Sequence, residues 1–398
     1  MLTASLEAEL IALCSDLLQI KSYSGAEQDI VRRLEAVFAG KAGWEVQVDA
    51  YGSLCAGHTG RRPGKRVLFD AHVDTVPVPD PEHWAEDPFG GVVRDGRIYG
   101  RGASDMKGAL AAMIVAAEAF IADTKGDFAG EVVISGVVQE ESFEGIAARS
   151  ISQNVNPDFV IIGEASDLNL KHGQRGRAEI VLETVGRAAH SANPGAGLNA
   201  VYPMSELIAG LRQLPVPKHP VLGQGILELT DIISSPYPGL SVVPETCRAT
   251  CDRRLLVDET RDSVLQPIQE LLQRTAAGVP DLQVHGGYAF GRETCYTGQG
   301  IETERFFPAW LLDPSDPFVQ SACRGLQRAG LQPELAVYSF CTNGSHYAGE
   351  ANIPSIGFGP SSESQAHVRD EWIAVEQLLG ACRGYYGLML ELLHGRIG

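Results

Sequence analysis

Paired cysteines and an excess of basic charge are the two features this sequence most clearly lacks. Its eight cysteines are scattered and none forms a C-x-x-C pair. We therefore expect reduced, mostly buried thiols in a cytoplasmic protein, not a disulfide framework. The 32 Lys and Arg are outnumbered by 50 Asp and Glu, giving a net charge of −18. This balance argues against a nucleic-acid or anionic-membrane partner, because both need basic patches.

Long apolar runs are also missing. No stretch approaches the roughly 18 apolar residues that a membrane span requires, so none is expected. The first ten residues carry acids and no basic segment, so we expect no signal peptide. Hydrophobic and charged contents of 44% and 21% are those of an ordinary globular protein. A length of 398 residues suggests roughly two to three domains.

The order of the expected helices and strands predicts an α/β fold with an insertion. An amphipathic helix at 5–20, a second helix at 26–38 and an apolar helix at 109–120 alternate with short apolar strands up to about residue 164. From 178 to 289 the pattern becomes strand–helix–strand–strand–helix–strand, which is typical of a small two-layer α+β unit. The α/β pattern then resumes. We therefore predict one domain from 1–175 and 291–398, with a second domain at 176–290 inserted into it.

Several buried strands end in acidic or imidazole side chains. His72 and Asp74 lie two apart after the apolar run 67–69, so both point to one face of an extended chain. A His that ligates a metal often donates its second ring N–H to such a carboxylate, although a purely structural pair would look the same. Glu140 and Glu141 follow another apolar strand, and Glu164 a third. In open α/β sheets, ligands bind outside the carboxyl ends of the strands.

The residue types gathered in this way favour a pair of metal ions. Asp105 follows a Gly-rich loop at the start of a helix, where a simple N-cap is the alternative interpretation. Two imidazoles and three carboxylates suit Zn²⁺, Co²⁺ or Mn²⁺. Five ligands fit two ions about 3.5–4 Å apart if one carboxylate bridges them. Glu140 would then be free to act as general base. The candidate ligands are His72, Asp105, Glu141, Glu164 and His367.

Five motifs follow one another along the chain: His72-Val-Asp74-Thr-Val-Pro, Gly102-Ala-Ser-Asp105-Met-Lys-Gly, Glu140-Glu141, Glu164 and Ala366-His367. In this order they resemble the M20 co-catalytic zinc peptidases, a group that includes acetylornithine deacetylase, succinyl-diaminopimelate desuccinylase, aminoacylase-1 and carboxypeptidase G2. The resemblance implies a zinc-peptidase-like catalytic domain with a mixed central sheet flanked by helices, interrupted by a ferredoxin-like lid and dimerisation domain. It also implies His72 and Glu164 on one zinc, Glu141 and His367 on the other, and Asp105 bridging. Asp74 would orient His72, and Glu140 would be the base.

The same resemblance assigns roles within the insertion. His190, in the segment 186–194, matches a lid His that reaches the partner subunit's active site and polarises the scissile carbonyl; by itself it would be a surface-loop His. Arg254 matches an Arg that grips the substrate carboxylate. Ser241 stands where several members carry a substrate-binding Asn, and Asn343 lies in a turn where many carry Asp. Segments 340–345 and 358–360 are most similar to a branch labelled selenium-metabolism-linked hydrolases.

The sequence therefore predicts a metal-dependent amidohydrolase with two Zn²⁺ per subunit, for which Co²⁺ or Mn²⁺ could substitute. Its expected substrates are N-acyl amino acids, as for acetylornithine deacetylase, or short peptides with a free carboxylate. The alternatives are a di- or aminopeptidase or carboxypeptidase of the same family, and a non-catalytic amino-acid- or peptide-binding protein on the same fold. We expect a small-molecule substrate, a homodimer formed through the lid, and neither a nucleic-acid nor a membrane partner.

Overall fold

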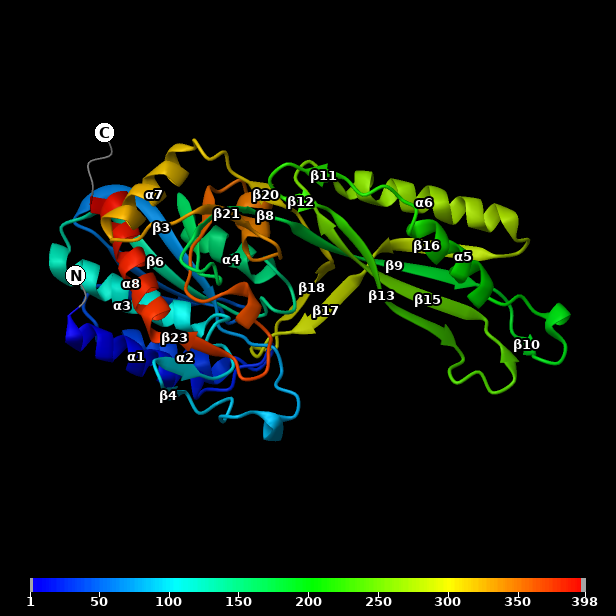
Figure 1. The fold of residues 1–398 in the computed structure, drawn as a ribbon, viewed down its shortest axis with the longest axis horizontal. Helices are drawn as coiled ribbons and strands as arrows, with labels where there is room; N and C mark the ends of the chain where they lie inside the picture. Colours follow the sequence, from blue (N-terminus) through cyan, green and yellow to red (C-terminus); the bar gives the residue numbers. More distant parts are fainter. Residues whose placement is uncertain (1–2, 395–398) are drawn as a thin grey trace.

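A nine-stranded mixed sheet forms the centre of the larger of two units in the computed structural model, which describes residues 3–394 (Figure 1). The strand order is β1-β2-β6-β3-β7-β22-β8-β20, with β21 also paired to β8. The strands are β1 Trp44–Val48, β2 Leu54–Thr59, β3 Arg62–His72, β6 Ala129–Val137, β7 Phe159–Ile162, β8 Leu170–Gln174, β20 Trp310–Leu311, β21 Leu335–Tyr338 and β22 Ser355–Gly357.

Four neighbouring strands of this sheet run parallel. β6 pairs with β3, β3 with β7, and β7 with β22, each in parallel register. Their carboxyl ends therefore meet at one edge, as the sequence led us to expect. The buried apolar segment 67–69 of β3 is continuous because both faces of the sheet are covered, which is typical of parallel strands. β1 and β2 run antiparallel at one side, so the sheet is mixed.

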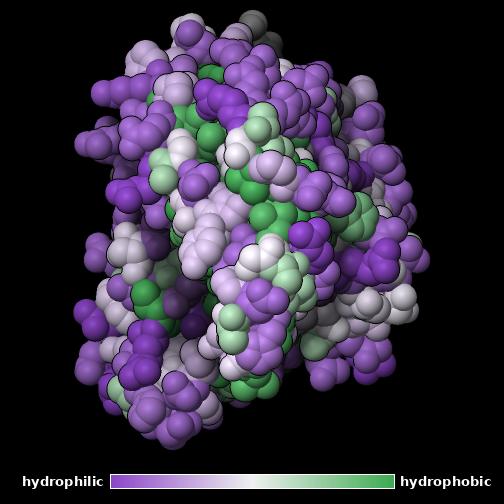
Figure 2. All heavy atoms as spheres, turned by 90° about the vertical axis from the view of Figure 1, so that its right-hand side faces the viewer, coloured by the Kyte–Doolittle hydropathy of each residue, from purple (hydrophilic) through white to green (hydrophobic). Residues whose placement is uncertain are grey.

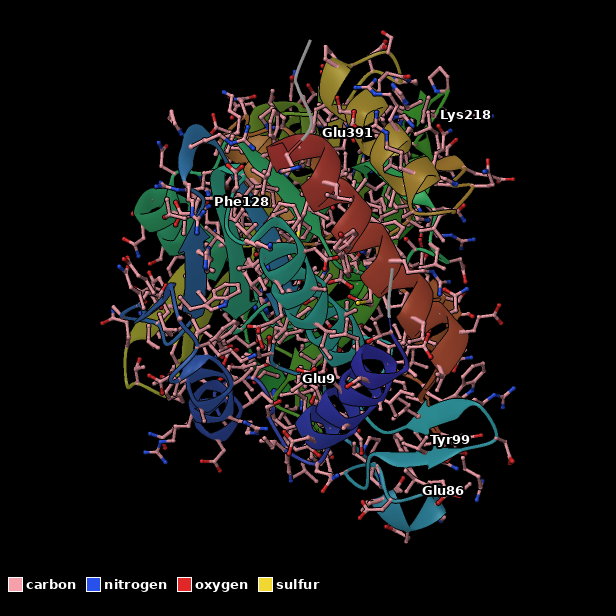
Figure 3. The ribbon with its side chains drawn as sticks, turned by 90° about the vertical axis from the view of Figure 1, so that its left-hand side faces the viewer. Glu9, Glu86, Tyr99, Phe128, Lys218 and Glu391 are labelled. Atoms are coloured by element: carbon pink, nitrogen blue, oxygen red, sulfur yellow. The ribbon has the colours of Figure 1, made fainter. Side chains whose placement is uncertain are left out.

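Helices cover this sheet, and α3 is the most completely buried of them. Its Ala-rich sequence lets α1 and α8 pack closely beside it, as Figure 3 shows. α3 begins two residues after Asp105, so burying this helix also fixes the position of that side chain. The helices are α1 Ala4–Leu18, α2 Gln28–Phe38, α3 Lys107–Thr124, α4 Ile146–Val155, α7 Pro317–Arg328 and α8 Val375–Met389, the last continued by a π-helical turn at Leu390–His394.

The inserted unit has its own sheet and its own apolar core. Its long strands pair antiparallel in the order β13-β15-β9-β16, and two helices pack against the sheet. This arrangement is the expected ferredoxin-like one. It extends away from the larger unit in Figure 1. The elements are β9 Gly176–Val185, α5 Val201–Leu211, β13 Ile226–Ser235, β15 Thr246–Leu255, α6 Arg261–Gly278 and β16 Gln283–Tyr288.

After the inserted unit, the chain re-enters the sheet of the larger unit later than the boundary predicted at residue 290. The boundary predicted after residue 290 falls inside β17, Phe290–Thr294, which forms a hairpin with β18, Gly300–Glu304. β19, Phe306–Phe307, then pairs with β9 of the inserted sheet, so the chain contacts that sheet once more before it reaches β20. The boundary predicted after residue 175 falls between β8 and β9.

Short elements complete the fold. They include a three-stranded sheet, β23-β5-β4, and two small ribbons, β10-β14 and β11-β12. Over residues 3–394 no helix is long and apolar enough to cross a membrane, and the eight cysteines are free. The elements are β4 Val92–Arg94, β5 Arg97–Tyr99, β10 Ala189–His190, β11 Lys218–His219, β12 Gly223–Gln224, β14 Val242–Val243, β23 Trp372–Ala374, short turns Pro81–His83, Pro194–Ala196 and Glu363–Gln365, and a π-turn Ser345–Glu350.

Candidate metal centre and active site

The first group of candidate ligands gathers around the end of β3. Nε2 of His72 lies 2.9 Å from Oδ1 of Asp105 and 3.5 Å from Oε1 of Glu164. One ligand atom from each of the three residues falls within 4.8 Å of the others. His72 is the last residue of β3, and Glu164 follows the adjacent parallel strand β7, whereas Asp105 comes from the loop before α3. The sequence placed all three at this edge of the sheet.

The second group shares Asp105 with the first. Nε2 of His367 lies 2.9 Å from Oε2 of Glu141 and 3.2 Å from Oδ2 of Asp105. Asp105 therefore offers one carboxylate oxygen to each group, which is the arrangement that a bridging ligand requires. His367 follows β22 and has a positive φ of 61°, which turns the loop so that its ring faces Glu141.

The donor set and its electrostatics fit a pair of divalent cations. Burial raises the pKa of Glu164 well above its ordinary value, and the neighbouring Asp105 raises it further. Burial alone would also raise the pKa of Asp105, but hydrogen bonds from His367 and His72 hold it well below its usual range. Oε1 of Glu141 is buried, and no described residue forms a hydrogen bond with it. So many buried carboxylates need a compensating positive charge, and imidazole and carboxylate donors without thiolate suit Zn²⁺, Co²⁺ or Mn²⁺.

Glu371 stabilises the loop that carries Asp105 through hydrogen bonds. It is completely buried; its Oε1 accepts from the backbone N–H groups of Ser104 and Asp105 at 2.8 and 3.1 Å. Its Oε2 accepts from Nη1 of Arg101 at 2.6 Å and from the N–H of Gly102 at 3.2 Å. A single carboxylate thus fixes four donors of one loop. The sequence analysis missed this role, and the only signal was an acid shortly after His367.

The role predicted for Asp74 needs correction. Nδ1 of His72 is 2.9 Å from the backbone carbonyl oxygen of Asp74, but 3.7 Å from its carboxylate. The carbonyl therefore orients the ring. The carboxylate instead accepts from the backbone N–H groups of Glu140 and Glu141, each at 3.1 Å, and from Oγ of Ser24 at 2.7 Å. Asp74 thus positions the pair of glutamates that follows β6.

Glu140 lies beside both ligand groups. It is buried, and its Oε1 has no hydrogen-bond partner among the described residues. Burial raises the pKa of Glu140 well above its ordinary value; the nearby His72 opposes this rise, whereas Glu164 adds to it. Without metal ions, this carboxyl group therefore holds a proton more strongly than an exposed glutamic acid does.

One cavity of about 430 Å³ connects these groups with the inserted unit. Arg254 of β15 and Arg177 of β9 line the same cavity as Glu140. Nε of Arg254 pairs with Oδ1 of Asp252 at 2.8 Å, and within residues 3–394 its two Nη atoms form no hydrogen bond with the chain. Arg177 donates to Glu144 at 2.7 Å. The sequence singled out Arg254, but neither Arg177 nor Glu144.

The structure contradicts the substrate-binding role predicted for Asn343. Its side chain is buried, and both ends of the amide are engaged within the protein. Oδ1 accepts from the N–H of Gly145 at 2.9 Å, and Nδ2 donates to Oδ2 of Asp70 at 3.0 Å. Asp70 is itself fully buried, and it also accepts from Ser135 and Tyr347. Asn343 is therefore a structural residue beneath the site.

His190 and Ser241 lie together, away from the metal ligands. His190 is in β10, at the far end of the inserted unit in Figure 1, and pairs with Val242 of β14. The carbonyl oxygen of Ser241 accepts from the N–H of Ser191 at 2.8 Å. Both residues are exposed, and neither lines the cavity of its own chain.

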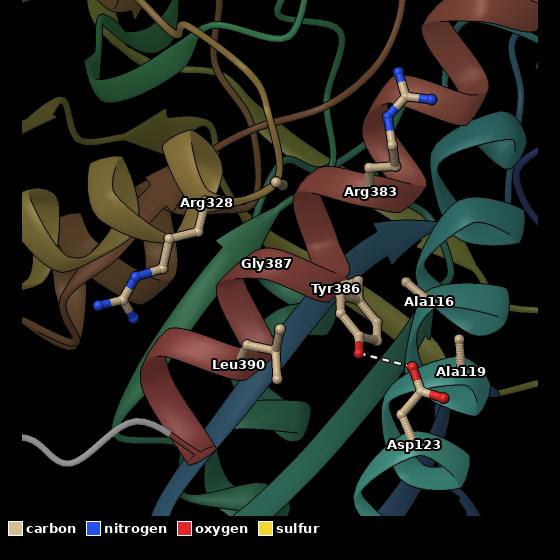
Figure 4. Close-up of a pocket in the computed structure, with 9 residues that line it drawn as sticks. Ala116, Ala119, Asp123, Arg328, Arg383, Tyr386, Gly387 and Leu390 are labelled. Atoms are coloured by element: carbon tan, nitrogen blue, oxygen red, sulfur yellow. Dashed lines mark hydrogen bonds between the residues drawn. The ribbon is translucent and has the colours of Figure 1, made fainter. Parts of the chain in front are cut away.

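A second cavity, of about 180 Å³, lies between α3, α7 and α8 (Figure 4). Small side chains such as Ala116 and Ala119 line it, together with Asp123 and Tyr386, which are hydrogen-bonded to each other at 2.8 Å. Arg328 and Arg383 point away from each other, so the lining residues do not converge on a ligand. The candidate active site is therefore the cavity of about 430 Å³.

Comparison with known proteins agrees with this geometry. Residues 68–391 match the model of peptidase family M20/M25/M40. The chain belongs to this family. It is 30% identical over 395 residues to the uncharacterized protein YgeY of Escherichia coli strain K12, covering 97% of this chain and 95% of that one. It is 27% identical to succinyl-diaminopimelate desuccinylase 2 of Ruegeria sp. strain TM1040, covering 98% and 96%.

Solved structures of two peptidases share the fold. Aminopeptidase PepT from Bacillus cereus superposes with a TM-score of 0.76 at 18% identity, covering 97% of this chain and 98% of that one. YXEP of Bacillus subtilis, described as a dinuclear metal-binding peptidase of the M20 family, gives 0.72 at 15% identity, covering 97% and 98%. The protein is thus a hydrolase of the M20 family that acts on amide bonds.

Proposed function

We propose that this M20 hydrolase uses two metal ions to cleave the amide bond of N-acyl amino acids or of short peptides with a free carboxylate. One observation carries the proposal: a single cavity is lined by ligands of both groups, by Glu140, whose Oε1 has no hydrogen-bond partner within residues 3–394, and by Arg254. Its volume of about 430 Å³ suits a small molecule.

We assign two Zn²⁺ ions to the site, one held by His72, Glu164 and Asp105, the other by Glu141, His367 and Asp105. The shared carboxylate and the donor types support this assignment. When bound, such ions supply Lewis-acid polarisation and lower the pKa of water. Glu371 and Asp74 would hold the ligands in place through the backbone hydrogen bonds described above.

Glu140 is the residue that we propose moves the proton. Its Oε1 is buried and unpartnered, so it is free to accept a proton from the attacking water. The same oxygen would return that proton to the leaving nitrogen, which then departs as a neutral amine.

Arg254 is the residue that we propose binds the substrate carboxylate. Its Nε is anchored by Asp252, which leaves the two Nη atoms free to form the bidentate pair that a guanidinium makes with a carboxylate. This contact would distinguish substrates with a free carboxylate from their amide or ester derivatives.

We further propose that 176–290 is a separate lid domain and that two subunits pair through it. β13 is at the edge of its sheet, and apolar side chains are exposed on and after this strand, including Ile232, Ile233, Tyr237 and Leu240. Figure 2 shows hydrophobic side chains exposed on the face that this end of the molecule presents. An exposed apolar edge strand is a ready surface for pairing with a second copy.

Such a dimer would bring His190 to the partner subunit's cavity. Two inactive variants test this directly, because each keeps the residue that is replaced in the other. We expect His190→Ala and Glu140→Gln to be inactive alone, and activity to return when the two are mixed and allowed to exchange subunits. In a mixed dimer, one of the two sites would contain both an intact Glu140 and an intact His190. Mixing without any recovery would exclude action across the dimer.

The test of the reaction is hydrolysis measured with metal-stripped and Zn²⁺-restored protein side by side. The panel is N-acetyl-ornithine, N-acetyl-citrulline, N-succinyl-diaminopimelate, N-acetyl-methionine and several dipeptides. We expect zinc-dependent cleavage of one acyl amino acid above the rest. Preferred cleavage of dipeptides would assign a peptidase instead. Ligand binding with no cleavage of any amide would support a non-catalytic binding protein.

A further inference from the structure

Arg177 and Arg254 are direct neighbours across two strands of the inserted sheet. β15 pairs with β9 in a register that places Arg254 opposite Arg177. Like charges in this position repel each other and destabilise a sheet. Asp252 lies two residues before Arg254, on the same face, and offsets the repulsion. Its Oδ1 pairs with Nε of Arg254 at 2.8 Å, and its Oδ2 with Nε of Arg177 at 2.9 Å.

Arg177 also reaches the larger unit. Its Nη1 donates to Oε1 of Glu144 at 2.7 Å. Glu144 is buried in the loop that begins with Glu140 and Glu141. Arg305 binds the same loop, because its Nη1 donates to the carbonyl oxygen of Ser142 at 2.8 Å. Arg177 therefore connects the strand that carries Arg254 with the loop that carries the proposed base.

Sharing the carboxylate of Asp252 determines how Arg254 is held. Because Oδ2 of Asp252 pairs with Arg177, Oδ1 remains for Arg254, and its closest contact there is Nε at 2.8 Å. Without Arg177, both oxygens would be available, and Asp252 could form a bidentate pair with Arg254 that occupies one of its Nη atoms. Glu144 would at the same time lose its cation in a cavity that already contains Glu140 and Glu141.

We propose that Arg177 is a positioning residue that keeps the Nη atoms of Arg254 free for the substrate carboxylate, and so sets the preference for substrates with a free carboxylate. This inference rests on the proposed function. Arg177 does not itself touch the reacting atoms. Its effect runs through Asp252 to Arg254, with Glu144 fixing its other end.

The test compares Arg177→Met and Arg177→Lys with the wild type on an N-acyl amino acid and on its carboxamide. For Arg177→Met we expect the KM of the acid to rise about ten- to hundredfold, the worth of one charge-assisted hydrogen bond, while kcat changes only a few-fold. The ratio of kcat/KM for acid over amide should fall by the same factor. Lysine should restore part of this preference, because it keeps a cation beside Glu144.

Asp252→Asn is a second test of the same contacts. It removes the carboxylate that holds Arg254, so it should also lower the ratio of kcat/KM for acid over amide. Arg292→Met is the matched control: Arg292 pairs with Glu302 at 2.7 Å on the exposed β17–β18 hairpin. Zinc content and circular dichroism establish that each variant is folded and loaded. An unchanged acid-to-amide ratio in both Arg177→Met and Asp252→Asn would overturn the inference. So would a loss confined to kcat, which would place the effect on the loop of Glu140.

The outcome also separates this inference from the proposed function. A wild type that cleaves an acyl amino acid, together with an Arg177→Met variant of unchanged preference, would refute only the role of Arg177. A zinc-loaded wild type that neither cleaves nor binds N-acetylated amino acids, as judged by calorimetry, would refute the proposed function and this inference with it.

Discussion

Replacing Glu371 should separate the stability of the fold from the affinity of the metal site. Glu371→Gln keeps the shape of the side chain and one acceptor oxygen. That oxygen can still accept from the N–H groups of Ser104 and Asp105, but the amide nitrogen that replaces Oε2 cannot accept from Arg101. Arg101 is only 3% exposed, so it would remain as an unpaired buried charge. Removing one partner of a buried pair costs about 3–5 kcal/mol of unfolding free energy.

Glu371→Ala removes every acceptor, including the one that fixes the backbone of Asp105. Loss of an outer hydrogen bond that holds a ligand usually lowers metal affinity about 10–100-fold. We therefore expect alanine to reduce both stability and zinc affinity, and glutamine to reduce mainly stability. Urea unfolding of the metal-stripped protein measures the first quantity. Competition with a chromophoric chelator measures the second.

The control is Glu376→Ala, an exposed acid in the first turn of α8, five positions along the chain. Its unfolding free energy and zinc affinity should match those of the wild type. Equal zinc affinities for the wild type and Glu371→Ala would refute the argument that Glu371 positions Asp105. Equal unfolding free energies for the wild type and Glu371→Gln would refute the importance of the buried pair with Arg101.

Three further predictions concern the base, the cluster of acids and the dimer. Glu140→Gln should lower kcat about 10²–10⁴-fold with metal content unchanged by elemental analysis; loss of metal would make Glu140 a ligand. Metal-stripped protein should become less stable as pH rises from about 4.5, because burial raises the pKa of Glu140 and Glu164, and the folded form loses its extra protons as they ionise. Thermal melts with and without zinc test this; a metal-free melting temperature that rises over this range would contradict it. Leu240→Glu, at a position 84% exposed, should convert dimer to monomer in light scattering, whereas Val93→Glu on the larger unit should not.

The edge of the sheet where the ligands meet could be predicted because the information is local. An apolar run followed directly by His72, by Glu140 and Glu141, or by Glu164 identifies both a strand and what lies at its end. The parallel order of β6, β3, β7 and β22 then places these ends together. The ferredoxin-like insertion was predictable for the same reason, since its alternating strands and two helices follow one another along the chain.

What could not be predicted depends on partners far apart in the chain. Glu371 accepts from Asp105 across 266 positions, and Asn343 donates to Asp70 across 273. Nothing near Asn343 indicates that its amide points into the core and not into the cavity. Similarly, the pattern around Asp74 shows which face its side chain takes, but not that the carbonyl reaches His72 first. The hairpin β17–β18 was missed because its strands pair only with each other, outside both main sheets.

The two units contribute different parts of the cavity, and this division has a kinetic consequence. The larger unit supplies both ligand groups and Glu140, which would act on the reacting bond. The inserted unit supplies Arg177 and Arg254, which would contact a part of the substrate that does not react. Binding energy from such a remote group mainly lowers KM unless it is used to align the reacting bond. Because Arg177 is hydrogen-bonded to Glu144, three residues after Glu141, that alignment has a physical route: a substrate carboxylate held by Arg254 would be fixed relative to Glu140. Substrates lacking the carboxylate should therefore lose a few-fold in kcat as well as affinity. Glu144→Gln, which weakens the link but leaves Arg177 paired with Asp252, should lose only this few-fold part of kcat.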